Sequence, residues 1–223
     1  MVCLQTFINT HIYNSLMLNA EFKLFEAFLH NPSKELYGRE IERLAGTTHE
    51  RTITYLNKLV NQKALIREKR GRQVFYRINK EHELVQKALS FAELKKRIEF
   101  SKHNEIAFTI QNLVSQELKE YQTSIYFIIL FGSVARKQNA ESSDIDLLLV
   151  LIQDGKIKSK LEEIIKRREK ITGGKISLHA VTIEELEKGW LKEPIYKNIW
   201  DERIVFYGEE NFWRFVLKNG EPL

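Results

Sequence analysis

Hydrophobic residues recur at helical spacing in the first part of the chain. Phe22 and Phe25 predict a helix over residues 20–31, which Asn31-Pro32-Ser33 brings to an end. Ile41 and Leu44 then predict the inward-facing side of a second helix in KELYGREIERLA. The tight turn Ala45-Gly46-Thr47 follows directly. Two helices in quick succession are therefore expected before residue 47.

A third helix is predicted after this turn. Thr47 and Glu50 have the spacing of a capping box, in which a hydroxyl and a carboxylate each satisfy a free backbone N–H. Its inner side is predicted to hold Ile53, Leu56, Leu59 and Val60. Its outer side is predicted to hold His49, Arg51, Thr52, Tyr55 and Lys58. A helix with a polar and basic outer side, joined to its predecessor by a short glycine-bearing turn, is typical of a helix-turn-helix.

The segment ALIREKRGRQVFYRIN predicts a hairpin with a cationic tip. Leu65, Val74, Tyr76 and Ile78 alternate with polar residues around Lys69-Arg70-Gly71-Arg72. Residues 48–80 carry nine Lys or Arg and two Glu, a density that suits a surface that meets an anionic polymer. Charge density alone is better explained by a solvated face.

Three helices followed by a basic hairpin resemble the winged-helix family of DNA-binding domains, over about residues 20–80. The resemblance implies that the third helix enters the major groove of double-stranded DNA and that the hairpin touches the backbone or minor groove. It places Arg51, Thr52, Tyr55 and Lys58 near bases and phosphates, with Lys69, Arg70 and Arg72 on the wing. Winged helices also serve as protein-docking modules, and they often read twofold sites, which implies a homodimer.

Residues 82–120 read as helical, with a break near Ser101-Lys102-His103-Asn104. We therefore expect a DNA-binding domain over residues 1–82, a helical linker over 83–104 and a second domain over 105–223. The apolar surface of the linker is expected to pack on a partner or on the second domain.

The second domain contains two strongly apolar strands with polar residues at one end of each. SIYFIILF ends in Gly132-Ser133, and a short helix including Arg136 can begin there. Glycine lets a phosphate oxygen approach the backbone closely, serine adds a hydroxyl donor, and a helix start adds positive potential. The second strand begins at Asp144 and Asp146, whose alternation puts both carboxylates on one face.

Two carboxylates this close favour a cation between them. Mg²⁺ prefers oxygen ligands and completes its shell with water and substrate phosphates. The bland alternative is an acidic strand end exposed to water. The Gly-Ser pair twelve residues upstream makes the metal and phosphate interpretation the better one.

The segment GSVARKQNAESSDIDLLLV closely resembles the nucleotidyltransferase superfamily, which includes polymerase beta and the small stand-alone transferases. The resemblance is strongest over residues 124–151 and extends to 207. It implies that Gly132, Ser133 and Arg136 hold a nucleoside triphosphate, that Asp144 and Asp146 bind Mg²⁺, and that a hydroxyl attacks the alpha phosphate. The stand-alone members are often paired with a separate helical protein, so such a partner is implied by resemblance only.

Active members of this superfamily usually carry a third carboxylate on a later strand. The matching strand here is KISLHAVT, whose alternating positions offer Ser177 and His179 instead. His179 could act as a base or be a polar residue on a sheet face, and Glu184 or Glu185 could reach back from the next helix. A competing hypothesis is therefore a transcriptional regulator whose transferase-like domain has lost catalysis and serves as a nucleotide sensor or dimerisation body.

The remaining sequence features set limits on these hypotheses. The 223 residues are 43% apolar and 29% charged, which fits an α/β (α+β) protein of two domains, a winged helix and a nucleotidyltransferase fold with a small mixed sheet. No apolar run is long enough to cross a bilayer, and we expect a cytoplasmic protein without a membrane partner. Cys3 is the only cysteine, which excludes an internal disulfide and a cysteine-built zinc site. A repair polymerase is disfavoured, because no further domain for gripping a primer and template is evident.

Overall fold

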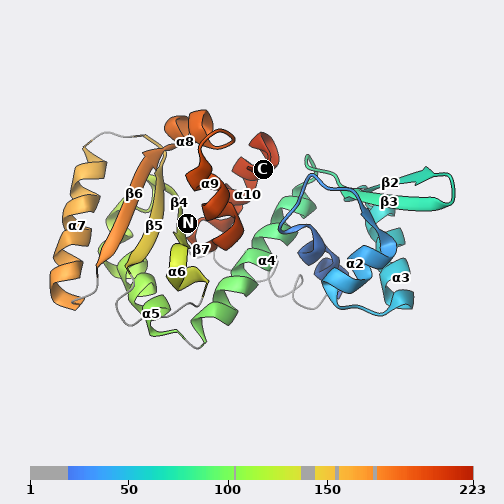
Figure 1. Ribbon diagram of the computed structural model, residues 1–223, viewed down its shortest axis with the longest axis horizontal. Coiled ribbons are helices and arrows are strands. Elements are labelled where there is room, and N and C mark those ends of the chain that lie inside the picture. Colours follow the sequence, from blue (N-terminus) through green and yellow to red (C-terminus); the bar gives the residue numbers. More distant parts are fainter. Residues whose placement is uncertain (1–19, 103, 137–143, 154–155, 173–174, 223) are drawn as a thin grey trace, which may run out of the picture. The chain divides into compact units, whose positions relative to one another are not determined.

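The computed structural model describes residues 20–102, 104–136, 144–153, 156–172 and 175–222. The chain divides into two compact units, one ending at Ala92 and one beginning at Glu93 (Figure 1). The boundary lies inside helix α4 (Glu83–Ser101), in the stretch that the sequence suggested as a linker. We call the two parts the N-terminal unit and the C-terminal unit and describe each by itself.

The N-terminal unit combines three helical segments with a small antiparallel sheet. Its elements are η1 (Ala20–Phe28, a 3₁₀ helix), β1 (Leu36–Tyr37), α2 (Gly38–Ala45), α3 (His49–Asn61), β2 (Leu65–Arg70), β3 (Gln73–Ile78) and the start of α4. The strand order is β1-β3-β2, and β2 and β3 form the predicted hairpin. The predicted helices and the hairpin are present at the expected places.

Helix α3 is rotated relative to the sequence-based expectation. The helix begins at His49, its N-cap is Thr48, and no side chain caps it, so the predicted Thr47–Glu50 capping box is wrong. Thr52 is only 1% exposed, whereas Ile53 is 47% exposed. Since successive helical residues are about 100° apart, a buried side that follows Thr52, Leu56 and Leu59 leaves Ile53 outside.

Thr52 is buried because its hydroxyl is satisfied inside the unit. The hydroxyl donates to the carbonyl oxygen of Thr48 at 2.8 Å and lies 2.7 Å from the hydroxyl oxygen of Thr47. Two hydrogen bonds remove most of the cost of burying a polar group. The prediction that Thr52 lies on the outer side is therefore wrong, and Leu44, predicted to face inward, is exposed.

The C-terminal unit is built on a mixed four-stranded sheet with the order β6-β5-β4-β7. Its strands are β4 (Ile125–Phe131), β5 (Ile145–Leu151), β6 (Ile176–Thr182) and β7 (Ile204–Tyr207). Strand β4 is antiparallel to β5 and to β7, and β5 is parallel to β6. The prediction of a small mixed sheet is confirmed.

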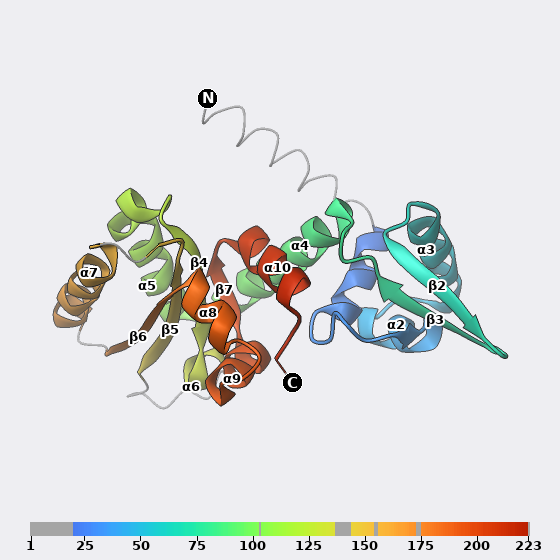
Figure 2. The same cartoon turned by 90° about the horizontal axis from the view of Figure 1, so that it is seen from above.

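Helices cover both faces of this sheet (Figure 2). They are α5 (Glu105–Asn112), the π-helix η2 (Leu113–Glu117), η3 (Lys119–Tyr121), α6 (Gly132–Ala135), α7 (Ile157–Thr172), α8 (Ile183–Gly189), α9 (Pro194–Glu202) and α10 (Glu209–Asn219). Helices α5 and α7 cover one face, where Ile110 and Leu161 join the apolar cluster with Leu130 and Leu147. The alternation of β4 and β5 supplies side chains to both faces, which explains their continuous apolar runs.

Aromatic side chains fill the other face, which α8, α9 and α10 cover (Figure 2). Phe127 of β4 packs edge-on against Phe212, with ring centroids 5.5 Å apart. Trp190 and Trp200 meet edge-on at 6.4 Å, and Trp213 is fully buried. These aromatic residues belong to the core of the C-terminal unit.

Long apolar helices are absent from the described part of both units. Among the residues that the structure describes, none of the helices has both the length and the hydropathy needed to cross a bilayer.

Candidate functional site

The polar ends of the four strands of the C-terminal unit lie at one edge of the sheet. Strand β4 ends where its antiparallel neighbours β5 and β7 begin, and β6 begins beside β5 because the two are parallel. The residues at the end of β4 and at the starts of β5, β6 and β7, or in the connections next to them, are thus brought together. Gly132, Asp144, Asp146, Lys175 and Glu202 all belong to this set.

Gly132 and Asp146 are in direct contact at this edge. Phe131 pairs with Asp146 across the two strands, so the turn into α6 starts beside Asp146. Gly132 has φ 77°, and a Cβ at this position would lie 2.2 Å from Oδ2 of Asp146. The close approach and the left-handed backbone both require glycine here. The structure thus brings together the glycine turn and one of the two predicted acids.

The donors of the glycine turn are occupied by a carboxylate that the sequence did not suggest. The backbone N–H of Gly132 donates to Oε2 of Glu202 at 2.8 Å. Nη1 of Arg136 forms an ion pair with Oε1 of the same side chain. Ser133 is half-buried beside them in the short helix α6. An anion is therefore already bound where a phosphate was predicted.

Asp144 has a cationic partner from the residue that precedes the neighbouring strand β6. Its Oδ2 accepts a hydrogen bond from Nζ of Lys175 at 2.6 Å, and Lys175 is largely exposed. The hydrogen bond and the charge of Asp144 raise the pKa of Lys175. A lysine thus neutralises one of the acids for which the sequence suggested a metal ion.

Burial raises the pKa of Asp146, and the negative charges of Asp144 and Glu202 act in the same direction. A hydrogen bond from Ser177 opposes this shift. Ser177 is the residue paired with Asp146 in the parallel β5–β6 ladder. The position on β6 closest to Asp146 therefore carries a hydroxyl and no carboxylate.

The other suggested replacements for a third carboxylate are engaged elsewhere. The ring of His179 lies 6.2 Å from the ring of Tyr196, and its Nε2 is buried without a hydrogen-bond partner among the described residues. Glu185 completes a capping box with Thr182, which lowers the pKa of Glu185, and Glu184 pairs with Lys188 at 2.6 Å. Local contacts thus hold both glutamates at the start of α8.

The residues present fit a magnesium ion only as a partial ligand set. Within the described ranges, no group of three or more His, Cys, Asp or Glu side chains is placed to hold a metal. Asp144 and Asp146 supply carboxylate oxygens, and Mg²⁺ in proteins is commonly held by one or two carboxylates together with water and substrate phosphates. The two aspartates are therefore adequate for a magnesium ion that arrives with its nucleotide.

Two contributors to this edge, Lys175 and Glu202, were missed by the sequence analysis. Lys175 stands directly before β6, and Glu202 stands two residues before β7. A sequence signal did exist, because charged residues that precede strands starting at one edge must gather there. Reading it requires the strand order, which the apolar pattern does not give.

In the N-terminal unit, the predicted DNA-contacting residues are found in different environments. Arg51, Lys69 and Arg72 are exposed, and Tyr55 is half-buried. Lys58 pairs with the buried Glu21 at 2.6 Å. Arg70 pairs with Glu35 and Glu68, each at 2.7 Å.

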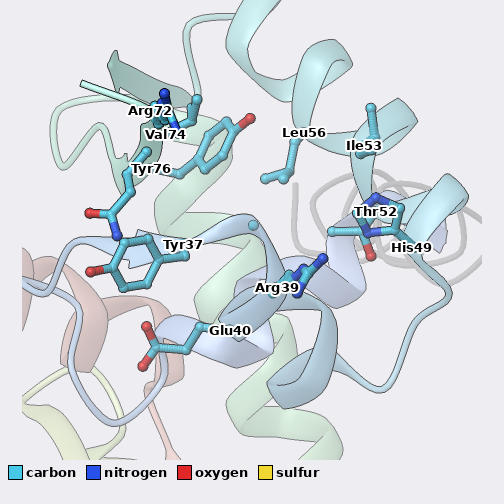
Figure 3. Close-up of a pocket in the computed structure, with 12 residues that line it drawn as sticks. Tyr37, Arg39, Glu40, His49, Thr52, Ile53, Leu56, Arg72, Val74 and Tyr76 are labelled. Atoms are coloured by element: carbon cyan, nitrogen blue, oxygen red, sulfur yellow. The ribbon is translucent and has the colours of Figure 1, made fainter. Parts of the chain in front are cut away.

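A pocket of about 780 Å³ lies in the N-terminal unit between the start of α3, the start of α2 and strand β3 (Figure 3). Figure 3 shows Arg39 and His49 on its helical side and Tyr37 and Tyr76 on its sheet side. Of the predicted DNA-contacting residues, only Thr52 and Arg72 line it. The pocket and the predicted contact surface thus overlap only in part.

Comparison with known proteins supports a nucleotidyltransferase domain in the C-terminal unit. Residues 112–206 match the family described as "Nucleotidyltransferase domain", which is less than half of the chain. The predicted resemblance is confirmed for this part. The search of curated proteins found no match.

Several solved structures are similar to this chain at low sequence identity. A toxin–antitoxin structure with AMP-PNP is 13% identical over 48% of this chain and 83% of that chain, with a TM-score of 0.35. A candidate nucleotidyltransferase from Sulfolobus solfataricus is 20% identical over 52% and 86%, with a TM-score of 0.30. A mutant of the toxin–antitoxin MntA–HpeT is 12% identical over 48% and 83%, with a TM-score of 0.33.

Proposed function

We propose that the C-terminal unit binds a nucleoside triphosphate with Mg²⁺ and transfers its nucleotidyl group to a hydroxyl acceptor. The observation that carries this proposal is the contact between Gly132 and the carboxylate of Asp146, where a Cβ would come within 2.2 Å of Oδ2. A backbone N–H that donates a hydrogen bond to phosphate and a carboxylate that binds the metal can act on the same ligand only when they lie this close. The match of residues 112–206 to nucleotidyltransferases supports the same activity.

In this proposal, some residues of the sheet edge bind the phosphates and others bind the metal ion. The Gly132 N–H, the Ser133 hydroxyl and the Arg136 guanidinium bind phosphate oxygens, and Asp144 and Asp146 hold Mg²⁺. Bound Mg²⁺ supplies neutralisation of the phosphate charge. The acceptor oxygen bonds to the alpha phosphorus, the bond to the bridging oxygen breaks, and pyrophosphate leaves. The hydroxyl proton passes to a carboxylate oxygen of Asp146.

Transfer of label from a triphosphate labelled on the alpha phosphate tests this function. The wild-type protein with magnesium is expected to label its acceptor and to release pyrophosphate, whereas Asp146→Asn does neither. Asp201→Asn is a matched control, because Asp201 is an exposed acid on the same helix as Glu202. Labelling that survives in Asp146→Asn would refute the proposed site.

A second candidate function is a nucleotide sensor without catalysis. The specific observation in its favour is the β6 strand, which presents Ser177 to Asp146 where active relatives are expected to carry a carboxylate. This hypothesis predicts saturable binding of nucleotide with magnesium and no pyrophosphate. Release of pyrophosphate at a useful rate would exclude it.

We further propose that the N-terminal unit binds double-stranded DNA. The order of elements, with helices before a basic hairpin, and the exposure of Arg51, Lys69 and Arg72 support this proposal. Because Thr52 is buried, we leave it out of the contact set. Fluorescence anisotropy with a labelled duplex tests it, and binding that does not weaken with rising salt would contradict it.

A further inference from the structure

The carboxylate of Glu202 occupies two donors that the proposed function assigns to phosphate. The Gly132 N–H donates to its Oε2 at 2.8 Å, and the Arg136 guanidinium pairs with its Oε1. The Glu202 side chain is mostly buried, with 18% of its surface exposed. A phosphate oxygen and the Glu202 carboxylate cannot accept the same hydrogen bonds at once, so a triphosphate must displace Glu202.

The backbone at Glu202 is fixed, so the displacement is confined to the side chain. The next residue, Arg203, is 1% exposed, and its guanidinium carbon lies 3.7 Å from the centroid of the Trp200 ring. Its Nη1 donates to the carbonyl oxygen of Trp200, and its Nε lies 3.4 Å from Oε2 of the buried Glu93. These contacts anchor the end of α9 beside Asp146.

Displacement changes the charge balance at the sheet edge. While Glu202 is paired with Arg136, the two charges cancel. Once Arg136 has turned to a phosphate, the Glu202 carboxylate has lost its partner and remains close to Asp146. A cation is then needed to compensate two carboxylates, and the only new cation that enters with a triphosphate is its metal ion.

We propose that Glu202 is the third carboxylate of the site and that it exchanges partners, leaving Gly132 and Arg136 for the metal side of Asp146 when a triphosphate takes those donors. The inference rests on the proposed function. Strand β6 carries no acid opposite Asp146, because Ser177 stands there. In this proposal, Glu202 of α9 provides the missing carboxylate. The exchange also makes metal binding and triphosphate binding depend on each other through one side chain.

Calorimetric titration of ATP into the full chain, with magnesium and with EDTA, tests the exchange. Without metal, Glu202→Gln is expected to bind ATP about tenfold more tightly than wild type, because the neutral amide competes less well for Gly132 and Arg136. With magnesium, this advantage is expected to vanish or reverse, because the variant lacks a carboxylate for the metal. Magnesium should therefore strengthen ATP binding at least about tenfold more in the wild type than in Glu202→Gln.

Two further variants control the measurement. Asp201→Asn removes one negative charge from the same helix end and should keep the wild-type response to magnesium. Glu202→Asp keeps the charge with a shorter side chain and should respond between wild type and Glu202→Gln. It also serves as the comparison if Glu202→Gln does not fold.

The outcomes distinguish a failure of this inference from a failure of the proposed function on which it rests. An equal magnesium effect in wild type and Glu202→Gln overturns the exchange and leaves the proposed function intact. Failure of the wild type to bind ATP under either condition overturns both. In the ligand-free protein, the Gly132 amide resonance should shift in Glu202→Gln, and an unchanged resonance would show that the contact itself is absent.

Discussion

The exposed cations of the proposed DNA-binding surface and the cations of the sheet edge differ in their surroundings. In the N-terminal unit, Arg51, Lys69 and Arg72 are exposed, and within the part of the chain that the structure describes none of them pairs with a carboxylate. In the C-terminal unit, Arg136 and Lys175 are each bound to an acid at the sheet edge. Three of the proposed DNA-contacting cations are thus open. Lys58 and Arg70 in the same unit are paired with acids, as are Arg136 and Lys175 at the sheet edge.

This difference determines how each unit can meet a polyanion. An open cation gains affinity mainly by releasing counterions from the polyanion, a gain that depends on salt and hardly on shape. A paired cation must first give up its carboxylate, so its ligand has to satisfy the released acid as well. The first arrangement suits a long uniform polyanion, and the second suits a small ligand that carries its own metal.

The largest expected effect separates the two units by function. Asp146→Asn should lower nucleotidyl transfer at least about a hundredfold, since it removes a metal ligand and a proton acceptor. The affinity of the same variant for duplex DNA should stay within about twofold of wild type. Label transfer and fluorescence anisotropy measure the two activities, and a parallel loss of both would show that the comparison between units is mistaken.

A second effect concerns stability at the sheet edge. Gly132→Ala and Gly220→Ala both put an alanine at a positive φ, 77° and 85°, but only the first meets another residue. We expect Gly220→Ala to cost about 1–3 kcal/mol of unfolding free energy, because φ 85° with ψ 174° is a backbone region that residues other than glycine rarely adopt. Gly132→Ala should cost about 1–3 kcal/mol more, because Cγ and Cβ of Asp146 also lie within 3.3 Å of the added methyl group.

Urea unfolding followed by circular dichroism compares these two variants. Both variants carry the strain of a positive φ, and only Gly132→Ala adds a contact with Asp146, so a larger loss in Gly132→Ala reports that contact. Equal losses in the two variants would contradict the close approach on which the candidate site depends.

A smaller effect is expected from the arginines at the tip of the β2–β3 hairpin, of which one is open and one is paired with acids. Arg72→Ala should weaken binding to duplex DNA about two- to tenfold and reduce the slope of log affinity against log salt by about one. Arg70→Ala should have less effect, because Glu35 and Glu68 already bind the Arg70 guanidinium. Both residues lie at the tip of the same hairpin, so each controls for the other in anisotropy titrations at several salt concentrations.

Much of the fold could be predicted because its elements follow local patterns. The apolar runs of β4 and β5 and the alternating hairpin of β2 and β3 were predictable from their own residues. Helix α3 was predicted, but its rotation was not. A buried threonine looks like an exposed one in sequence until its hydrogen bonds to Thr47 and Thr48 are known.

Only the part of the candidate site that lies on the adjacent strands β4 and β5 could be predicted from the sequence. The turn at Gly132 and the acids of β5 are joined by a short connection, so their proximity follows from adjacent strands. Lys175 and Glu202 come from β6 and from the end of α9, and their arrival at the same edge depends on the strand order β6-β5-β4-β7. Such long-range pairing is not encoded in local periodicity.

The smallest expected effect tests how the acids of the C-terminal unit act on one another. Burial and the charges of Asp144 and Glu202 raise the pKa of Asp146 in the folded protein. A carboxyl whose folded pKa is raised stabilises the fold while it is protonated, and this contribution is lost as the pH rises from the ordinary aspartate range through the raised value. Asn at this position does not titrate. The unfolding free energy of Asp146→Asn relative to wild type should therefore increase across that window, by less than about 1 kcal/mol because the group is partly exposed.

Ser177→Ala gives this titration an internal check. The Ser177 hydrogen bond lowers the pKa of Asp146 and so opposes the other influences. Its removal should raise that pKa further and move the loss of stability to higher pH. Urea unfolding of metal-free protein at a series of pH values compares the three proteins. A pH profile of Ser177→Ala displaced to lower pH would mean that the Ser177 hydrogen bond does not favour the ionised carboxylate of Asp146, contrary to the structure.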